Sequence, residues 1–549
     1  MDNKLHREFI LKATSSNVQS SIDFASFKKK FYSSHKSPQP TNADIRELYE
    51  QMIKQRKIKR NTILEKAMQS RGVRTQSGVA VVAVLTRPSD CPGKCLYCPT
   101  EKDMPKSYLS NEPAVMRAIA NKFNPYNQVQ SRLKALELNG HLTNKIELIV
   151  MGGTFSYFPK TYQKKFITQC FRACNDYPKQ VHEVSRVHKI IKLADEQKRN
   201  EKTKHRIIGL TLETRPDYIN KKEIENFRNL GCTRVELGVQ SIFDDVLKLN
   251  QRGHLISETI RATKLLKDAG FKINYHMMPG LPGSTIAKDV KMFRELFSNE
   301  NFQPDMLKIY PTVVVKNSAL YKFWKNGDYK PLTDKQFEKF IIKIKNEIIP
   351  PYVRIARLVR DVPTPSIEAG PIISNMRQIV AEKSNCQCIR CREVKTDYNI
   401  KDLPASLRET LQAGNIILDR IDYAASDGHE IFLQFVSPDK NKLFALLRLR
   451  ITSTPNSLIN QNDSKKLRSY GIIREVHTYG KLAQINKKDK TSPQHIGLGK
   501  RLIKEAEKIA REEFGVKKIA IISGIGVRGY YRKLGYRLKD TYMVKCIKQ

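Results

Sequence analysis

The sequence predicts a mixed α/β protein with two α/β domains behind a basic helical region, and three observations support this. The 549 residues exceed what one hydrophobic core organises. Through residues 76–370, short apolar stretches alternate with amphipathic helical spacers, a pattern that indicates a parallel sheet with right-handed crossovers. After residue 425 the predicted order changes to strand, strand, strand, helix, strand, which indicates a second α/β unit at 426–549.

Residues 1–75 carry no strand signals and are predicted to be helical and basic. Between Gln51 and Arg74 there are eight Lys or Arg residues and one acid, Glu65. A solvated helix face explains many such runs. Here the whole chain has 98 Lys and Arg against 55 Asp and Glu, a net charge of +43, so we favour a surface that binds the phosphates of a nucleic acid.

The chain is expected to be a globular cytoplasmic protein without a membrane segment. It is 40% hydrophobic, its longest apolar run, near Val79–Leu85, is too short to cross a bilayer, and its start lacks the apolar core of a signal peptide. Ten cysteines in a reducing compartment are better interpreted as metal ligands, catalytic thiols or packing residues than as disulfides. Four isolated ones are expected to be buried packing residues: Cys170, Cys174, Cys232 and Cys546.

Six strands are predicted in the first α/β unit, at 78–86, 146–153, 207–214, 234–241, 271–280 and 306–315. They fit either a partial (β/α) barrel or an open doubly wound sheet. Polar or glycine residues close four of them: Gly152–Thr154, Glu213, Gln240–Ser241 and His276. Because ligands bind at the carboxyl edge of parallel strands, we expect the chemistry there.

Three cysteines follow the first strand, as Cys91-x3-Cys95-x2-Cys98. A structural zinc site takes four ligands and a redox motif takes two thiols. A [4Fe–4S] cluster held by three thiolates keeps one iron open, which can chelate S-adenosylmethionine (SAM). A zinc site with a borrowed fourth ligand is the alternative. This spacing, with Tyr97 before the last cysteine, is similar to the signature of radical-SAM enzymes.

The resemblance to radical-SAM enzymes extends to the next strand ends. Gly152 and Gly153 resemble the glycine motif that binds the SAM amino group, because glycine lets the backbone approach a ligand closely. Glu213 and Gln240 could reach the ribose or the methionine end of SAM, or could equally be satisfied polar residues of the core.

The predicted connector, residues 371–425, contains Cys386-x-Cys388-x2-Cys391. Three thiols within six residues suggest a structural Zn²⁺ whose fourth ligand is unidentified.

The C-terminal unit carries Gln494-His-Ile-Gly497-Leu-Gly499 directly before a long predicted helix. A glycine-rich helix N-terminus can bind a pyrophosphate through backbone N–H groups. Together with the flanking strands and the pair Tyr530–Tyr531, this resembles the acetyl-CoA site of GNAT acyltransferases. The resemblance assigns acetyl-CoA contacts to Glu475, Val476, His477 and Thr478, to Gly497, Leu498 and Gly499, and to Tyr531 near the thioester. Packing against the last helix is the alternative for the tyrosines.

Few families join these two units, and several further motifs narrow the choice: MGGTF (151–155), LETRPDY (212–218), GCTRVELGVQS (231–241), NQRGH (250–254), KIYPT (308–312) and RDVPTP (360–365). From about residue 70 to the C-terminus the chain resembles the catalytic subunit family of the Elongator complex, the tRNA uridine acetyltransferases. The expected fold is therefore a radical-SAM partial (β/α) barrel followed by a GNAT-type domain.

The resemblance implies one reaction that uses both units. A 5′-deoxyadenosyl radical from SAM abstracts hydrogen from the acetyl methyl group of acetyl-CoA, and the carbon radical adds to carbon 5 of the wobble uridine, giving 5-carboxymethyluridine. The implied catalytic residues are Cys91, Cys95, Cys98 and Tyr531, and the family alone adds Lys145 as an acetyl-CoA contact. The implied partner is the tRNA anticodon stem-loop, and accessory subunits or self-association stay open.

Two rival functions remain at this stage. A protein lysine acetyltransferase would use the cluster only structurally, but its basic substrate suits an acidic groove and this chain is basic almost throughout. An RNA-binding scaffold with decayed catalytic folds conflicts with the intact cysteine and glycine motifs.

Overall fold

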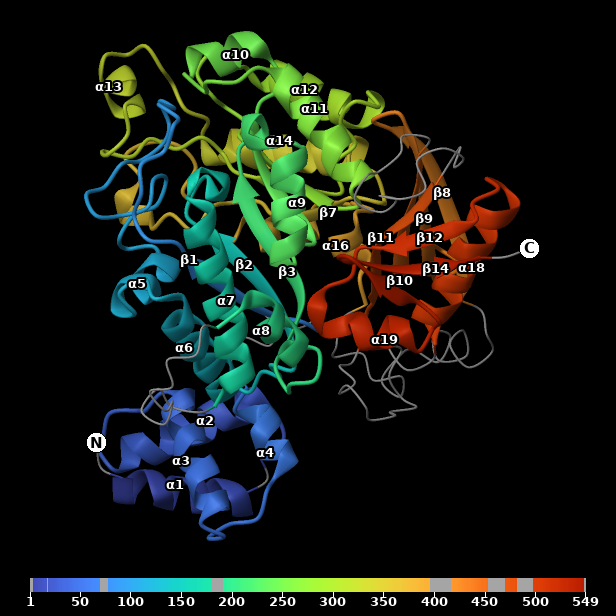
Figure 1. Ribbon diagram of the computed structural model, residues 1–549. Coiled ribbons are helices and arrows are strands. Elements are labelled where there is room, and N and C mark those ends of the chain that lie inside the picture. Colours follow the sequence, from blue (N-terminus) through green and yellow to red (C-terminus); the bar gives the residue numbers. More distant parts are fainter. Residues whose placement is uncertain are drawn as a thin grey trace.

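The computed structural model describes residues 3–16, 18–69, 78–178, 191–394, 416–452, 470–480 and 497–547 (Figure 1). Residues 494–496 of the predicted glycine motif therefore lie outside the described residues. Within the described ranges, no helix is long and apolar enough to cross a membrane.

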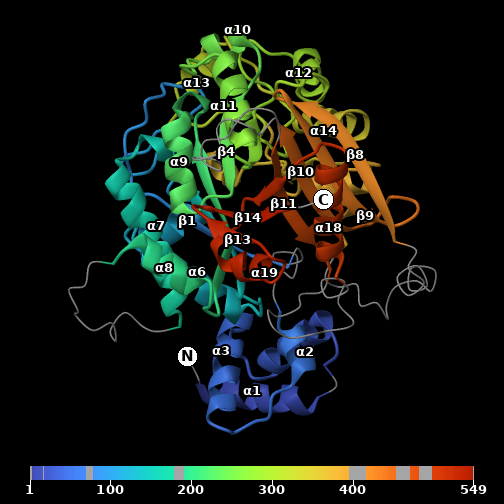
Figure 2. The same ribbon diagram turned by 45° about the vertical axis from the view of Figure 1, so that its right-hand side comes forward.

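The N-terminal bundle is a group of four helices with its own core, separate from the rest of the apolar interior. Phe9, Tyr32 and Tyr49 are fully buried at its centre. Capping boxes begin two of its helices, at Ser20 and Thr41, and satisfy backbone N–H groups there. Both ribbon views place this bundle (blue) below the other two units (Figures 1 and 2). Its helices are α1 (Asn3–Ser15), α2 (Ser21–Ser34), α3 (Asn42–Lys54) and α4 (Thr62–Ala67).

The first sheet contains seven parallel strands in the order β1-β2-β3-β4-β5-β6-β7. A strictly sequential order is that of a partial (β/α) barrel, and it excludes the doubly wound alternative, whose order reverses at a switch point. The strands are β1 (Ala80–Leu85), β2 (Lys145–Met151), β3 (Arg206–Thr214), β4 (Arg234–Gln240), β5 (Lys272–Met277), β6 (Met306–Ile309) and β7 (Arg354–Arg357).

Helices follow or separate these strands, as the alternation in the sequence predicts. They are α5 (Pro113–Ala120), α6 (Pro125–Leu138), α7 (Lys160–Asp176), α8 (Leu193–Asn200), α9 (Lys221–Leu230), α10 (Asp244–Leu249), α11 (Ile256–Asp268), α12 (Ile286–Ser298), α13 (Leu320–Lys325) and α14 (Asp334–Glu347). On α6, the buried Gln128 side chain accepts from Leu85 N (2.8 Å) and donates to Leu85 O (3.0 Å). This pairing satisfies the free edge of β1 directly before the loop that carries the three cysteines.

The C-terminal sheet is mixed, in the order β13-β14-β12-β11-β10-β9-β8. Strands β11 and β12 are parallel and are joined through α18 (Leu498–Glu512), and the other neighbours are antiparallel. Helix α18 packs against β9, β10 and β11. The remaining elements are β8 (Ile417–Ala425), β9 (Gly428–Val436), β10 (Leu443–Thr452), β11 (Tyr470–Thr478), β12 (Lys518–Ile521), α19 (Arg528–Arg532), β13 (Arg537–Lys539) and β14 (Tyr542–Cys546).

Between the sheets lie the short helices α15 (Met376–Glu382) and α16 (Ile389–Arg392). From the sequence, residues 371–425 are predicted to form this connector, but Ile417–Ala425 pairs along its whole length with β9, so the C-terminal sheet begins inside that stretch. A second difference concerns Cys546, which is exposed near the end of β14, whereas Cys170, Cys174 and Cys232 are buried as expected.

The two sheets share one continuous apolar core. The C-terminal sheet (orange to red) lies beside the first sheet in both views (Figures 1 and 2). The backbones of the two units also approach closely where Gly524, after β12, lies beside Ile208 of β3. A Cβ on Gly524 would lie only 1.9 Å from Ile208 O. Only glycine permits this approach.

Candidate active site

The three-cysteine loop begins at the carboxyl end of β1 and is anchored at both flanks. Its Leu96 N–H donates to Asn250 O at 3.2 Å, and Leu96 O accepts from Leu320 N at 2.8 Å. Cys91 is half-buried, with its Sγ 3.9 Å from Thr154 Oγ1, and Cys95 is buried. The sequence prediction that these thiols lie at the carboxyl edge of the parallel strands therefore agrees with the geometry.

The spacing of these thiols fits an iron–sulfur cluster better than a single zinc ion. One zinc with bonds of about 2.3 Å needs thiolates about 3.8 Å apart. Among the described residues, Cys386, Cys388 and Cys391 do form a group with all Sγ atoms within 4.8 Å of one another, whereas Cys91, Cys95 and Cys98 do not. Wider spacing suits a cluster in which each thiolate binds a different iron.

The thiols of Cys95 and Cys98 have different electrostatic surroundings. Burial, with the neighbouring Cys95, raises the pKa of the Cys98 thiol to about 11. Burial also acts to raise the pKa of Cys95, but the Arg252 guanidinium outweighs it and holds the pKa below the ordinary value.

Beside the loop, buried polar atoms without partners fit a bound polar ligand. Such orphaned groups are rare unless a ligand or water satisfies them. Thr86 follows β1 and Gln240 ends β4, and in the described part of the chain neither Thr86 Oγ1 nor Gln240 Oε1 has a hydrogen-bond partner. Gly152 and Gly153 follow β2 with φ of 128° and 90°. A Cβ at Gly152 would lie 1.9 Å from Thr86 Oγ1, so glycine keeps this edge open.

Glu213 belongs to a charged network inside the first sheet. It accepts from Tyr108 Oη at 2.9 Å and lies 3.5 Å from Lys308 Nζ. Lys308 also contacts Glu236. When His276 Nε2 carries a proton, it donates a further hydrogen bond of 2.8 Å to Glu236. Burial acts to raise the pKa of Glu236, but Lys308 and His276 hold it well below its usual range.

The ligand atoms of Glu213, Glu236 and His276 lie close enough to hold a metal ion. Lys308 already supplies the positive charge, so the group is satisfied without one. Sequence reasoning missed Glu236 and Lys308, although both lie in motifs that carried the resemblance.

The predicted pyrophosphate site lies at the start of α18. Gly497 is the N-cap, with φ of 85°, and apart from its neighbours in the chain no described residue lies within 4 Å of the position that a Cβ would take there. Leu498 and Gly499 are buried in the first turn. A Cβ on Gly499 would lie 3.3 Å from Tyr530 Oη and 3.5 Å from Thr478 Cγ2, so the helix N-terminus, α19 and the end of β11 meet here. Backbone N–H groups of a helix start lack intrahelical partners and attract anions.

Residues Glu475 to Thr478 form the last part of β11, where the strand is half-buried. Glu475 accepts from Arg448 Nε at 3.0 Å and from Lys272 Nζ at 3.1 Å. Burial lowers the pKa of His477 to about 4, so its ring is neutral at pH 7, and its Nε2 has no hydrogen-bond partner among the residues that the structure describes. Val476 lies 3.8 Å from a Cβ placed on Gly499.

Tyr531 and Lys145 lie near this part of the structure. Tyr531 is buried on α19 with its ring 5.2 Å from that of Tyr530, and burial raises its pKa, so the phenol stays protonated. Lys145 begins β2, at the opposite end from Gly152, and burial lowers its pKa. It pairs with Arg206, whose Cβ would lie 2.6 Å from a Cβ on Gly526 of the C-terminal unit.

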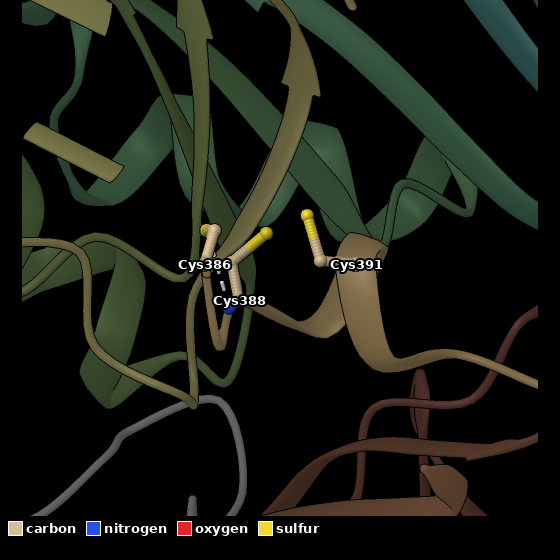
Figure 3. Close-up of side chains that lie close together, drawn as sticks. All are labelled: Cys386, Cys388 and Cys391. Carbon is tan, nitrogen blue, oxygen red and sulfur yellow. Dashed lines mark hydrogen bonds between the residues drawn. The ribbon is translucent and has the colours of Figure 1, made fainter. Parts of the chain in front are cut away.

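The connector thiols Cys386, Cys388 and Cys391 lie together beside β7, the third of them on α16 (Figure 3). No fourth His, Cys, Asp or Glu joins their group among the residues that the structure describes. The neighbouring Arg392 donates to Pro351 O and to Gln434 Oε1, both at 2.9 Å, and so links the first unit to β9.

The chain has relatives over most of its length. The Radical SAM superfamily profile matches residues 88–296, and the Radical_SAM C-terminal domain profile matches 304–385. A tRNA uridine(34) acetyltransferase of Methanocaldococcus infernus is 44% identical, covering 92% of this chain and 91% of its own length. Elongator complex protein 3 of Homo sapiens is 37% identical, and the match covers 88% of this chain and 87% of the human protein.

A solved structure supports the same assignment. Archaeal Elp3 of Methanocaldococcus infernus with an N-terminal deletion (1-46) superimposes with a TM-score of 0.71 at 42% identity, covering 86% of this chain and 99% of that one. The match therefore covers most of this chain and is not confined to the three-cysteine loop. The chain therefore belongs to the radical-SAM family that contains the tRNA uridine(34) acetyltransferases and Elongator complex protein 3.

Proposed function

We propose that the protein is a tRNA uridine(34) acetyltransferase that uses acetyl-CoA and SAM to make 5-carboxymethyluridine at the wobble position. The observation that carries the proposal is the presence of both candidate sites in one chain that is 44% identical, over 92% of its length, to a relative named for this activity.

Cys91, Cys95 and Cys98 are proposed to hold a [4Fe–4S] cluster with one open iron. When bound, such a cluster supplies the electron that cleaves SAM reductively. The chain's part is to orient SAM. Gly152 and Gly153 offer backbone groups beside Thr86. At the carboxyl end of β4, the side-chain carbonyl oxygen of Gln240 has no hydrogen-bond partner among the described residues. Glu213 is held by Tyr108 and Lys308, which supports a positioning role for it.

Acetyl-CoA is proposed to bind at the C-terminal sheet. Gly497, Leu498 and Gly499 would bind the pyrophosphate at the N-terminus of α18, where the helix dipole favours negative charge. The half-buried end of β11, residues 475–478, would face the pantetheine arm. The protonated phenol of Tyr531 would donate a hydrogen bond near the thioester, and Lys145 would contact the cofactor from β2.

The tRNA anticodon stem-loop is the proposed macromolecular substrate. Exposed cations on the α3–α4 loop support this, because phosphate contacts supply much of the affinity for nucleic acid. A zinc ion at Cys386, Cys388 and Cys391 is proposed to stabilise the connector, since their Sγ atoms already lie within reach of one ion.

One experiment tests the proposal. Protein reconstituted anaerobically with iron and sulfide is incubated with SAM, dithionite, acetyl-CoA and tRNA, and the nucleosides are analysed by mass spectrometry. We expect 5-carboxymethyluridine only in the complete mixture. Acetyl transfer to a histone-like peptide with no modified uridine would instead support a lysine acetyltransferase and overturn the proposal.

A further inference from the structure

The segment NQRGH, residues 250–254, lies directly against the three-cysteine loop. Asn250 O accepts the Leu96 N–H at 3.2 Å, and the Asn250 side chain donates to Val246 O at 2.8 Å and Pro282 O at 2.9 Å. Two residues later, the Arg252 N–H bonds to Leu247 O at 2.9 Å. Both ends of this contact are therefore fixed by backbone hydrogen bonds.

Arg252 reaches a proposed cluster ligand. Its Nη1 donates to Cys95 Sγ at 3.5 Å, and its Nη2 donates to Gly238 O on β4. The Arg252 side chain is buried, with 7% of its surface exposed. A Cβ on Gly238 would lie 2.7 Å from Arg252 Nη2, so glycine at this position leaves room for the guanidinium.

Within the described part of the chain, no carboxylate pairs directly with Arg252, and the charge of Asp217 acts on it only from beyond ion-pair distance. Among the described residues, no Asp or Glu is in ion-pair contact with this guanidinium, whose Nε also lacks a hydrogen-bond partner. A buried unpaired cation is costly, so an anion is expected beside it. A [4Fe–4S] cluster on three thiolates is negatively charged, and reduction adds one more negative charge.

We propose that Arg252 is a positioning residue that makes the cluster easier to reduce, by donating to Cys95 Sγ and placing a positive charge beside it. This inference rests on the proposed function. Hydrogen bonds to cluster sulfurs and nearby charge both affect reduction potential. A cation stabilises the reduced cluster more than the oxidised one, because the reduced cluster carries the extra electron.

Arg215 offers a matched comparison at the same loop. A Cβ on Gly93, between Cys91 and Cys95, would lie 2.4 Å from Arg215 Nη1. Unlike Arg252, Arg215 forms a bidentate ion pair with Asp217, with both contacts at 2.9 Å. Its charge is therefore largely neutralised, and its removal should change the cluster's potential less.

The test is the midpoint potential of the reconstituted cluster, measured without SAM by dithionite titration followed by EPR. The single electron from dithionite enters the cluster, and no bond forms or breaks. We expect Arg252→Gln to shift the potential to a more negative value, Arg252→Lys to restore part of the shift, and Arg215→Gln to shift it less. Iron and sulfide content and circular dichroism show whether each variant is folded and loaded.

Several outcomes would overturn the inference. One is an unchanged potential in loaded Arg252→Gln, and another is an equal shift in Arg215→Gln. A change seen only in SAM affinity would instead assign Arg252 to SAM. If Arg252→Gln does not load a cluster, Gly238→Ala decides, because it displaces the guanidinium while keeping its charge, and an unchanged potential there would reject the inference. If the wild type itself holds no cluster, the proposed function fails first.

Discussion

Glu475 carries a negative charge in a mostly buried position on β11, and two cations hold it there. Arg448 approaches from the neighbouring strand β10 and Lys272 from β5 of the first sheet. Burial acts to raise its pKa, but Lys272 and Arg448 lower it to about 2. The residue thus joins the proposed acetyl-CoA strand to the first sheet, and the ion pairs contribute stability wherever the carboxylate is ionised.

This arrangement predicts a pH-dependent loss in Glu475→Gln. A carboxylate whose pKa falls from 4.5 to about 2 on folding contributes about 3 kcal/mol at pH 7. That contribution is present above pH 4.5 and is lost as the pH falls towards 2, so the difference from wild type should shrink over this range. Urea unfolding at pH 7 and pH 3.5 measures it, with Glu512→Gln on the exposed face of α18 as the control. An equal difference at both pH values would contradict the ion-pair explanation.

At the scale of elements, the end of α3 and the loop that leads to α4 present four exposed cations: Lys54, Arg56, Lys57 and Lys59. The next residue, Arg60, differs because it pairs with Glu50 at 3.0 Å and Glu65 at 2.7 Å. The helices on either side are fixed by the core of the N-terminal bundle. The loop therefore presents its positive charges from a fixed position on the N-terminal bundle.

Reversal of these four cations to Glu should weaken tRNA binding and reduce its salt dependence. Log affinity falls with log salt by about 0.7–0.9 per phosphate contacted, so each lost contact flattens the slope. Filter binding across a series of salt concentrations measures this. The control variant reverses four other exposed lysines, Lys330, Lys335, Lys339 and Lys343, and changes the net charge equally. If both variants flatten the slope alike, the effect is one of overall charge and not of this loop.

The connector thiols predict a metal-dependent element. Cys388→Ser should release about one zinc per chain and lower the unfolding temperature, because the metal would no longer join Cys386 to Cys391 across the connector. Atomic emission for zinc, with calorimetry, tests this. The iron–sulfur absorbance should persist, and Cys546→Ser on the exposed end of β14 is the control. Wild-type protein without zinc would refute the assignment.

The elements that sequence reasoning found and missed differ in burial. Strand β2 is mostly apolar and is followed by two glycines, so its local residue pattern alone indicates a strand. Strand β7 has only four residues, two of them arginine, and β8 is an exposed edge strand with charges along it. Such strands lack a continuous apolar run: in β8, Ile421 and Tyr423 face the core and alternate with Arg420 and Asp422, because one side of the strand faces solvent. The cysteine motifs were predictable because their spacing is local.

At the scale of the whole molecule, a buried ionic network joins the two sheets. Arg474 lies where the β10–β11 register shifts, and it donates to Asp305 Oδ1 at 3.0 Å and to Glu430 Oε2 at 2.8 Å. Arg450 pairs with Glu430 at 3.2 Å and with Asp268 at 2.6 Å. The partners are up to 182 residues apart in sequence, so no local pattern could have predicted them. Separation of the sheets would expose or unpair these charges, which is costly.

Asp305 directly precedes β6, which carries Lys308 of the polar network beside Glu213. The two residues of the Arg474–Asp305 pair thus lie close in sequence to the two candidate sites: Asp305 is three residues before Lys308, and Arg474 directly precedes Glu475. Because the side chains of Arg474 and Asp305 are both fully buried, this pair holds the two sites in a fixed relation. A fixed distance and orientation between the two sites is needed if acetyl-CoA bound at one site reacts at the other. Two separate reactions would not require it.

Single substitutions at the two sites should therefore abolish the same product for different reasons. Gly497→Glu places negative charge where the N-terminus of α18 should bind pyrophosphate, so we expect acetyl-CoA binding and 5-carboxymethyluridine to be lost while the iron–sulfur absorbance remains. Cys95→Ala should lose the absorbance and the product but keep acetyl-CoA binding. Gly515→Glu, just past the end of α18, is the matched control. Gly515 also has a positive φ, 63°, and apart from its neighbours in the chain no described residue lies within 4 Å of the position that its Cβ would take. This variant should keep both acetyl-CoA binding and 5-carboxymethyluridine formation. Calorimetric titration and nucleoside mass spectrometry measure binding and product. If either Gly497→Glu or Cys95→Ala makes the modified uridine at the wild-type rate, the two sites serve separate reactions.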